Sequence, residues 1–283
     1  MDIDQARTFL AITAHGSFLQ ASRQLHLTQS TVSARIQRLE DELGARLFTR
    51  NRSGASLTQA GRRFLDYAKR LVLTADQARD DVGLPQRYRA SIRMGGRIAL
   101  WEGFLPQWVG WMRARARDVV IHSEIGFEQD LMQRLIEGSL DVGLMYTPSH
   151  SPGLIVEHLF DETLVLVSSR AGDTAPGEDY VYIEWGPGFY AQHAQSYPDL
   201  ERPSQIANIG WLGVQLTLAN GGSCFLPARM AASFIAAGRL HRVVGSPQYI
   251  HPAYMVYPRD TDNLVIAQAV DGLRELARQV PRA

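Results

Sequence analysis

Two short amphipathic helices joined by a tight turn, near the start of the chain, constrain its fold more than any other sequence feature. The first helix is expected to begin at Ser17 and to turn three apolar residues inward: Phe18, Ala21 and Leu25. After a turn at His26-Leu27, Thr28 has a side-chain oxygen placed to cap the second helix. Apolar residues recur in that helix at spacings of four, three and four, which places them on one face: Val32, Ile36, Leu39 and Leu43. The polar N-terminal face is left outward, as in the helix-turn-helix pairs that read the DNA major groove.

The segments on either side extend this pair into a small domain. Asp4 is expected to cap an earlier helix that runs to about Ala14, with its apolar residues inward: Phe9, Leu10 and Ile12. After the pair, two short extended segments flank a run of turn-forming residues that includes Gly54. This pattern predicts a β-hairpin, or wing, with Arg50 and Arg52 beside its turn.

A long helix is expected to follow the wing, from Thr58 to about Val82. Its apolar residues form a seam close to the heptad rule: Phe64, Tyr67, Leu71, Ala75 and Ala78. Because no neighbouring segment is available to cover this seam, we expect it to pair with the same helix of a second subunit. Packing on the core of its own domain is the alternative. Gly83-Leu84-Pro85 ends the helix and begins a hinge.

From residue 91 onward the pattern alternates between strands and helices, which is typical of an α/β fold with parallel strands. Strands are expected at residues 91–96, 119–127, 141–147, 154–160, 163–169, 180–185 and 253–258. Helices are expected at residues 101–116, 128–138, 210–219, 228–237 and 262–280. The strands 154–160 and 163–169 are expected to join at Asp161-Glu162 and to lead into a second lobe.

The distribution of charge favours a nucleic-acid partner for the N-terminal part. The whole chain has 29 Lys and Arg and 29 Asp and Glu, so it carries no net charge. Residues 1–70 contain eleven Lys or Arg and six Asp or Glu, an excess of five positive charges, so the remainder has an excess of five negative charges. A basic head on an acidic body is typical of a DNA-binding domain attached to a domain with another task.

No catalytic or metal-binding constellation is evident in the sequence. The eight His residues show no paired metal spacing, and His241 and His251 are expected on loops. Cys224, the only cysteine, excludes a disulfide within the chain and is expected to be a small packed residue. No signal-peptide pattern and no apolar run of membrane-spanning length is present. We therefore expect a cytoplasmic protein that is not an enzyme, has no membrane span and holds no cofactor.

The helix pair and its flanks resemble the N-terminal domain of LysR-type transcriptional regulators. The matching residues follow one another without a gap: Gly16-Ser17-Phe18, Ala21, Leu25 to Ser33, Ile36, Arg38-Leu39-Glu40, Leu43-Gly44, Leu47-Phe48, Arg50, Leu57-Thr58 and Ala60-Gly61. Two later segments are similar to the effector domain of this family: Glu137 to Leu144 and Gly221 to Pro227. Leu100-Trp101-Glu102 and Glu184 to Pro187 suggest its HdfR-like branch.

This resemblance implies an α/β chain with an N-terminal all-α winged helix-turn-helix domain, a long linker helix and a two-lobed α/β effector domain resembling periplasmic solute-binding proteins. The winged domain would occupy residues 1–58, the dimerisation helix 59–83, the hinge 84–90 and the effector domain 91–283. Within the effector domain, lobe 1 would comprise about 91–160 and 257–283, and lobe 2 about 161–256.

Helix geometry and the resemblance together assign the DNA contacts. Base edges are expected to be read by Gln29, Ser30 and Ser33, with Thr28, Thr31 and Gln37 beside them. Phosphate or minor-groove contacts are expected from Arg35, Arg38, Arg50 and Arg52. The family usually carries Arg near position 34, where this chain has Ala34. Arg38 could instead pair with Asp41 or Glu42 on its own helix.

The resemblance also implies a small-molecule effector, bound where strand ends and helix N-termini meet between the lobes. The predicted effector-binding residues are Arg97, Ile98, Trp101, Phe127, Gln129, Tyr146, Thr147, Trp185 and Phe189. A guanidinium at Arg97 among aromatic rings would suit a carboxylate with an apolar or aromatic body. In the alternative, Arg97 pairs with Glu102 or Glu128, fills the cleft and leaves a regulator that needs no effector.

The expected partners are double-stranded DNA with an interrupted inverted-repeat operator and, for transcription, RNA polymerase. The implied assembly is a homotetramer arranged as a dimer of dimers. Its second interface would join Trp108, Val109 and Trp111 to the helix of a neighbour that carries Met230, Ser233 and Phe234, although Trp108 could be buried within its own lobe. A small-molecule-binding protein without an operator, or a repressor independent of any effector, is the alternative function.

Overall fold

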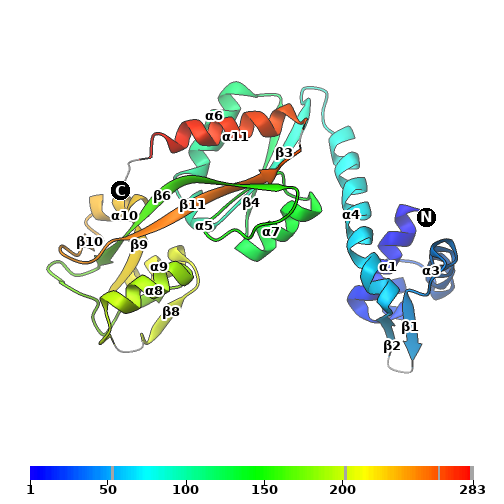
Figure 1. The fold of residues 1–283 in the computed structure, drawn as a ribbon, viewed down its shortest axis with the longest axis horizontal. Coiled ribbons are helices and arrows are strands. Elements are labelled where there is room, and N and C mark those ends of the chain that lie inside the picture. The colour runs from blue at the N-terminus through cyan, green and yellow to red at the C-terminus, as the bar shows by residue number, and fades with distance from the viewer. Residues whose placement is uncertain (52–53, 201–202, 261, 281–283) are drawn as a thin grey trace. The chain divides into compact units, whose positions relative to one another are not determined.

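A computed structural model describes residues 1–51, 54–200, 203–260 and 262–280 (Figure 1). These residues form two compact units, the first made chiefly of Met1–Pro85 and the second of Gln86–Ile136 and Leu140–Ala283. Arg52, which we predicted to contact DNA, lies outside the described residues.

The first unit is a bundle of helices with a two-stranded wing. Its helices are α1 (Ile3–His15), α2 (Phe18–Gln24), α3 (Gln29–Leu43) and α4 (Gln59–Val82), and its strands are β1 (Phe48–Asn51) and β2 (Gly54–Leu57). β1 and β2 pair antiparallel, which confirms the predicted hairpin. Thr28 caps α3 as predicted, and Ser17 and Thr58, where helices were expected to begin, likewise accept a backbone N–H from their helix.

Two details of this unit differ from the sequence-based expectation. Asp2, rather than Asp4, caps α1, because its carboxylate accepts the Gln5 N–H at 2.7 Å while the Gln5 side chain accepts the Asp2 N–H at 2.8 Å. Leu43, which we expected in the core, is 42% exposed because α3 ends there and Gly44 turns the chain away. The other inward residues of α3 are fully buried.

Helix α4 divides its apolar seam between two environments. Phe64 is buried in the core of its own unit, where its ring meets that of Phe9 at 5.0 Å edge to face. Tyr67 is 61% exposed, Leu71 and Ala75 are half-buried, and Ala78 is exposed. The alternative of packing on its own domain therefore holds for Phe64, and the rest of the seam, from Tyr67 to Ala78, is only partly covered within the described residues.

The second unit is built on a large mixed sheet. Its strands are β3 (Ala90–Gly96), β4 (Val119–Ile125), β5 (Val142–Met145), β6 (Leu154–Ser168), β9 (Ser223–Pro227), β10 (His241–Arg242) and β11 (Tyr249–Pro258). The strand order is β10-β6-β11-β5-β3-β4, with β9 also paired to β6. The parallel pairing predicted for the strands that alternate with helices from residue 91 is confirmed for β3 with β4 and β5. The remaining pairs of this sheet are antiparallel.

The helices and a small second sheet complete this unit. The helices are α5 (Ile98–Trp101), α6 (Leu105–Arg115), α7 (Glu128–Glu137), α8 (Pro187–Ser196), α9 (Gly210–Asn220), α10 (Ala228–Ala236) and α11 (Leu264–Ala277). The small sheet pairs β7 (Val181–Ile183) with β8 (Gln205–Ala207). Four elements were not predicted: α8, β8, β9 and β10. β8 and β10 have only three and two residues, α8 opens with the helix-poor pair Pro187-Gly188, and β9 follows the glycine pair Gly221-Gly222.

Three expected elements of this unit have different bounds. The predicted helix 101–116 is interrupted between α5 and α6, because Gly103 adopts a φ of +106° there. The predicted break at Asp161-Glu162 is absent, because both residues stay in register with Pro252 and His251 across the antiparallel β6–β11 pair. β11 consequently begins at Tyr249, and His251 and His241 lie in strands rather than on loops.

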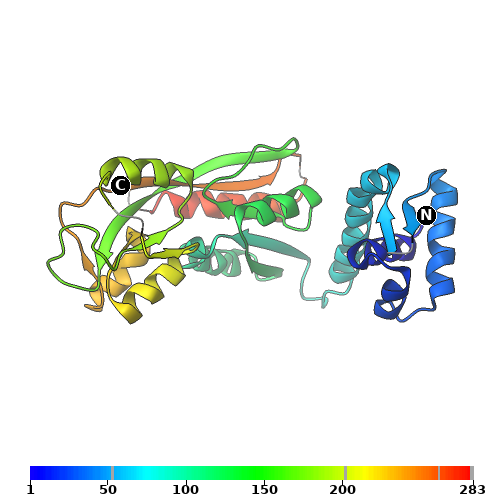
Figure 2. The ribbon, with the colours of Figure 1, turned by 90° about the horizontal axis from the view of Figure 1, so that it is seen from below.

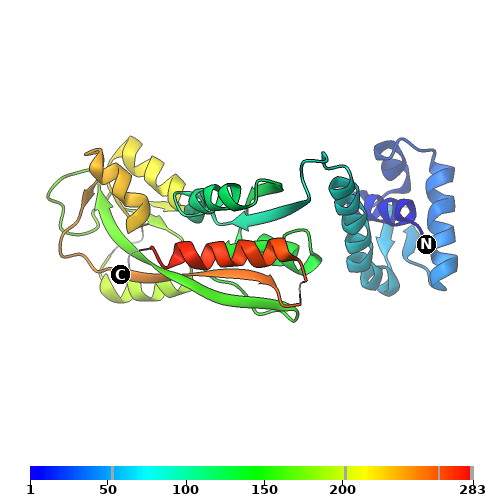
Figure 3. The ribbon, with the colours of Figure 1, turned by 90° about the horizontal axis from the view of Figure 1, so that it is seen from above.

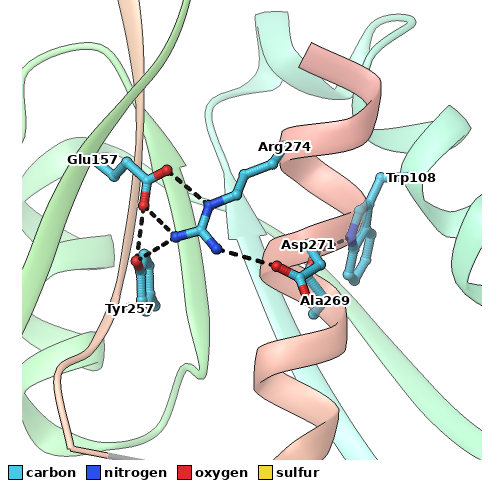
Figure 4. Close-up of polar contacts among 6 residues, drawn as sticks. All are labelled: Trp108, Glu157, Tyr257, Ala269, Asp271 and Arg274. Atoms are coloured by element: carbon cyan, nitrogen blue, oxygen red, sulfur yellow. Dashed lines mark hydrogen bonds and ion pairs between the residues drawn. The ribbon is translucent and has the colours of Figure 1, made fainter. Parts of the chain in front are cut away.

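The long β6–β11 pair runs beside α11, as Figures 2 and 3 show from opposite sides. Arg274 of α11 donates to both carboxylate oxygens of Glu157 on β6, at 2.9 and 2.8 Å, and Tyr257 of β11 donates to the same carboxylate at 2.8 Å (Figure 4). This hydrogen bonding with Arg274 lowers the pKa of the Glu157 carboxyl. On the other side of α11, the Trp108 Nε1–H donates to the Ala269 carbonyl at 2.9 Å (Figure 4). Trp108 is fully buried in its own unit, so it cannot form the subunit contact that the resemblance implied.

Candidate functional site

The outward face of α3 presents short polar side chains near its N-terminus. Thr28 accepts the Thr31 N–H at 3.2 Å, and its hydroxyl lies 2.9 Å from that of Ser30. Gln29, Ser30 and Arg38 are exposed, while Thr31, Ser33 and Gln37 are half-buried. The turn before this helix depends on His26, whose φ of +53° reverses the chain between α2 and α3.

The structure separates the two arginines of α3. Arg35, which we predicted to contact phosphate, lies against α1, where its guanidinium binds the Asp4 carboxylate at 2.8 Å. Arg35 reaches α1 because position 35 borders the buried face that carries Val32 and Ile36. Its phosphate contact stays a prediction. Arg38 points outward and has no ion-pair partner among the described residues.

Gln37 and the acidic residues of α3 form a separate chain of contacts. The Gln37 amide donates to Asp41 at 2.6 Å, and its oxygen accepts from Arg46 at 2.8 Å. Asp41 therefore bonds Gln37 rather than Arg38, in contrast to the alternative that the sequence left open. Both ends of the Gln37 amide are thus engaged by side chains of its own unit.

The wing is fixed to α3 by the buried carboxylate of Glu40. One of its oxygens accepts the backbone N–H groups of Leu47 and Phe48, at 2.7 and 3.2 Å. The other oxygen pairs with the Arg46 guanidinium at 2.8 Å. At the far end of β1, the Arg50 guanidinium lies 3.9 Å from the centre of the Phe18 ring, and the residue is exposed. Arg50 therefore stands beside the N-terminal part of the helix pair.

A largely apolar groove of about 680 Å³ follows the uncovered side of α4. Its walls include Leu71, Ala75 and Ala78 of the predicted dimerisation seam, together with Ile3 of α1 and Leu43 of α3. The exposed side chain of Leu43, which the core does not use, thus joins the same surface as the α4 seam.

In the second unit, Arg97 is engaged by groups of its own chain. Its guanidinium lies 3.2 Å from the Glu128 carboxylate and 4.6 Å from the centre of the Phe127 ring. Only 11% of the Arg97 side chain is exposed. The neighbouring Trp101 donates its indole N–H to the Glu124 carbonyl at 2.8 Å. The pairing of Arg97 with Glu128 is the alternative that the sequence analysis kept beside a ligand-binding role.

A cavity of about 620 Å³ lies between the end of β5, helix α8 and the β6–β11 pair. Four predicted effector-binding residues line it: Tyr146, Thr147, Trp185 and Phe189. The other five are not among its lining residues: Arg97, Ile98, Trp101, Phe127 and Gln129. Sequence reasoning missed several further lining residues: His150, His158, Gln192, His251 and Tyr254.

His251 is the most buried polar residue of the cavity wall, at 5% exposure. Its ring lies 4.2 Å from that of Tyr146 and 5.7 Å from that of Trp185, measured between centres. Burial, together with the nearby charge of Arg97, lowers the pKa of His251 to about 4. The ring is therefore neutral near pH 7. The burial of β11 alternates from Tyr249 to Met255, but its sequence YIHPAYM does not alternate between polar and apolar residues, so no period-two signal marked His251 as a strand residue.

Behind the cavity, Arg229 of α10 holds the two lobes of this unit together. Its guanidinium binds the carbonyl oxygens of Ala99 and Glu102, at either end of the α5 turn, and the Glu162 carboxylate of β6. Glu162, which is 3% exposed, also accepts the Tyr146 hydroxyl at 3.4 Å. Burial and the adjacent Glu162 raise the pKa of Tyr146. The Tyr146 side chain therefore connects the cavity to this network.

The remaining chemistry of the described residues is limited. Among them, no group of three or more His, Cys, Asp or Glu residues is arranged to hold a metal ion. Within the same residues, no helix is both long and apolar enough to span a membrane. Cys224 is buried, and its burial raises the pKa of the thiol to about 12.

Comparison with known proteins gives matches to both units. Residues 3–62 match the family model "Bacterial regulatory helix-turn-helix protein, lysR family", and residues 85–278 match "LysR substrate binding domain". The chain is 31% identical to the HTH-type transcriptional regulator HdfR of Escherichia coli O45:K1 over 268 residues, which cover 93% of this chain and 94% of HdfR.

Solved structures share the fold over its whole length. The crystal structure of full-length CbnR complexed with its target DNA has a TM-score of 0.72 at 20% identity, covering 98% of this chain and 100% of CbnR. Full-length LysG from Corynebacterium glutamicum with bound effector Arg has a TM-score of 0.58 at 18% identity, covering 100% of both chains.

Proposed function

This chain belongs to the LysR family of DNA-binding transcriptional regulators, and from that premise we propose that α3 reads an operator under the control of a small molecule bound in the second unit. The observation that carries the proposal is the outward face of α3, where polar Gln29 and Ser30 are exposed, together with the exposed cations Arg38 of the same helix and Arg50 of the wing. Short polar side chains suit base edges, and exposed guanidinium groups suit phosphates.

The proposed contacts fall into two sets. Gln29, Ser30 and Ser33 would read bases, supported by Thr28, Thr31 and, after it releases Arg46, Gln37. Arg38, Arg50 and Arg52 would bind phosphate or the minor groove. Arg35 would do so only by leaving Asp4, and we assign it instead to the positioning of α3 on α1.

The DNA proposal is tested by the fluorescence anisotropy of two labelled duplexes, one from the region upstream of this chain's own gene and one of scrambled sequence. The Gln29→Ala variant should lose about 1–3 kcal/mol on the upstream duplex alone. The Arg38→Ala variant should weaken binding to both duplexes alike and flatten the salt dependence by about 0.9 in log–log slope.

A matched control for these variants is Arg242→Ala, which removes a guanidinium from exposed β10 in the second unit. It should leave both affinities unchanged. Equal losses on the two duplexes for Gln29→Ala would remove this residue from the base-reading set. An unmodified protein without preference for the upstream duplex would contradict operator recognition there.

We propose a homotetramer, a dimer of dimers, as the assembly that binds an interrupted inverted repeat. The α4 groove would form one interface, because it presents uncovered apolar residues of the predicted seam. The second interface would use half-buried Val109 and Trp111 of α6 against Ser233 and Phe234 of α10 in a neighbour. Buried Trp108 and Met230 would contribute only by supporting these helices.

The cavity between β5, α8 and β11 is the proposed effector site. The effector Arg bound to LysG supports a small-molecule role for this kind of domain, without identifying the ligand of this chain. The pairing of Arg97 with Glu128 also supports a second candidate, a regulator that needs no effector. In either case the chain would act in the cytoplasm, where its operator is, without catalysing a reaction.

A further inference from the structure

We propose that the effector cavity binds a neutral, planar aromatic molecule that forms a hydrogen bond with His251 Nε2. The inference rests on the proposed function, since it names the class of ligand for the same cavity. The proposed ligand differs from the carboxylate that the sequence suggested, because the cavity lining contains His251 and aromatic rings but not Arg97.

The first observation is that His251 has a hydrogen-bonding atom without a partner in the described part of the chain. Its Nε2 atom is buried and has no hydrogen-bond partner among the described residues. A buried polar atom without a partner costs about 1–3 kcal/mol. His251 lines the cavity, and in this proposal a ligand hydroxyl, amide or ring nitrogen reaches Nε2 and recovers this free energy.

The second observation is the shape and chemistry of the walls around that atom. The rings of Tyr146 and Trp185 lie on His251, the former tilted by 31° and the latter by 68°. Phe189 of α8 and Tyr254 of β11 add further aromatic surface. Aromatic rings pack best against another flat ring, in offset-stacked or edge-to-face contact. The volume of about 620 Å³ lies within the usual range for small-molecule sites and accommodates a bicyclic ring system.

The third observation concerns charge. None of the described residues that line the cavity is Asp, Glu, Lys or Arg. The closest guanidinium groups are already paired, Arg97 with Glu128 and Arg229 with Glu162. His251 is neutral near pH 7, and His158 is hydrogen-bonded to Asp161 at 2.8 Å. A carboxylate in this cavity would lose its hydration without gaining a free cation, which is unfavourable.

A matched pair of probes tests the inference on the full-length protein. 2-Naphthamide and 2-naphthoate have nearly the same shape and differ in charge. Isothermal titration calorimetry at pH 7.5 should give tighter binding of 2-naphthamide to the unmodified protein. The His251→Phe variant, which keeps a ring and removes the nitrogen, should bind 2-naphthamide about tenfold more weakly, as expected for one lost hydrogen bond. The Arg242→Ala variant, which changes an exposed residue outside the cavity lining, is the control and should bind it as the unmodified protein does.

Three results would overturn the proposal: no binding of 2-naphthamide, tighter binding of 2-naphthoate, or an unchanged affinity in His251→Phe. Should His251→Phe fail to fold, the preference of the unmodified protein between the two probes decides alone. Anisotropy of the upstream duplex is measured in parallel without probe. Retained operator binding with no 2-naphthamide binding would reject the ligand class alone, whereas absent operator binding would reject the proposed function.

Discussion

Single buried side chains determine how the second unit responds to pH. His251 on β11 and His193 on α8 are both buried, and burial lowers the pKa of each ring. His193 lies 3.0 Å from the Tyr180 hydroxyl, whereas Nε2 of His251 has no such partner among the described residues. His251 is therefore the residue whose protonation the fold opposes most directly.

The free energy of unfolding should fall as the pH is lowered below about 6.5. In that window an unfolded His251 binds a proton, while the folded one, with a pKa of about 4, does not. The unfolded state thus takes up more protons, and His251 alone should remove about 2 kcal/mol by pH 5. Urea unfolding followed by tryptophan fluorescence at pH 7.5 and pH 5 measures this loss. The His251→Phe variant should lose about 2 kcal/mol less over the same interval; an identical loss would refute this assignment.

At the scale of elements, the wing depends on a contact that its own strands do not supply. β1 and β2 have only four residues each and pair only with each other within the described residues. An isolated two-stranded hairpin is marginally stable in water. Glu40 of α3 compensates by accepting the N–H groups of Leu47 and Phe48. Gly61 is needed at the base of the wing, because a Cβ there would lie 2.2 Å from the Leu47 carbonyl oxygen.

The Glu40→Ala variant should loosen the wing without unfolding the second unit. It leaves two buried N–H groups without an acceptor, which costs about 1–3 kcal/mol for each. Hydrogen–deuterium exchange of a peptide covering residues 45–57 should accelerate accordingly, and operator affinity should fall. Glu40→Gln keeps an acceptor oxygen and should show a smaller effect. Unchanged exchange in Glu40→Ala would mean that the hairpin holds its position without this carboxylate.

The α4 helix gives a second prediction at this scale. Leu71 is half-buried within one chain and lines the apolar groove, so a charge there should oppose association of two α4 helices. Light scattering of the Leu71→Asp variant should give a smaller assembly than the unmodified protein, with loss of operator binding. Arg63→Asp places the same charge on an exposed α4 position that does not line the groove, and it should preserve the assembly. An unmodified protein that is monomeric at micromolar concentration would end this model.

At the scale of the second unit as a whole, Arg229 connects segments that lie far apart in the sequence. Arg229 extends from α10 in one lobe. Its guanidinium binds backbone carbonyls of the α5 turn in the other lobe and the Glu162 carboxylate on β6, the strand that runs between the lobes. Tyr146 bonds Glu162, so a ligand that moves the Tyr146 ring would also disturb this link. Tyr146 thus connects the cavity that it lines to the Glu162 carboxylate at the junction of the lobes.

The Arg229→Met variant should destabilise the second unit by about 3 kcal/mol, because it leaves the buried Glu162 carboxylate without its cation. Urea unfolding at pH 7.5 provides the measurement. The double variant Arg229→Met/Glu162→Gln should recover part of the loss, since it removes the isolated charge. If the double variant were less stable than the single one, the carboxylate would not be the source of the destabilisation.

The sequence alone determined the features that depend on neighbours a few residues apart. The caps at Ser17, Thr28 and Thr58, the buried face of α3 and the start of α4 could all be predicted, because capping and helical periodicity are local. The predicted polar face of α3 follows from the same periodicity. The partners of its side chains could not be predicted in this way, since Arg35 is paired with Asp4 from a different helix.

Only the tertiary structure decided the features that join distant segments. Asp161-Glu162 stays in a strand because β11, about ninety residues later, supplies its register. Packing of β3 against α7 brings the Arg97 guanidinium into an ion pair with Glu128. Packing of β5 and β11 makes His251 a neutral, buried residue of the cavity wall. The sequence therefore predicted part of the residue set of the proposed effector site. The charge of the site and its unpaired hydrogen-bonding atom arise from burial and long-range pairing, which no local pattern encodes.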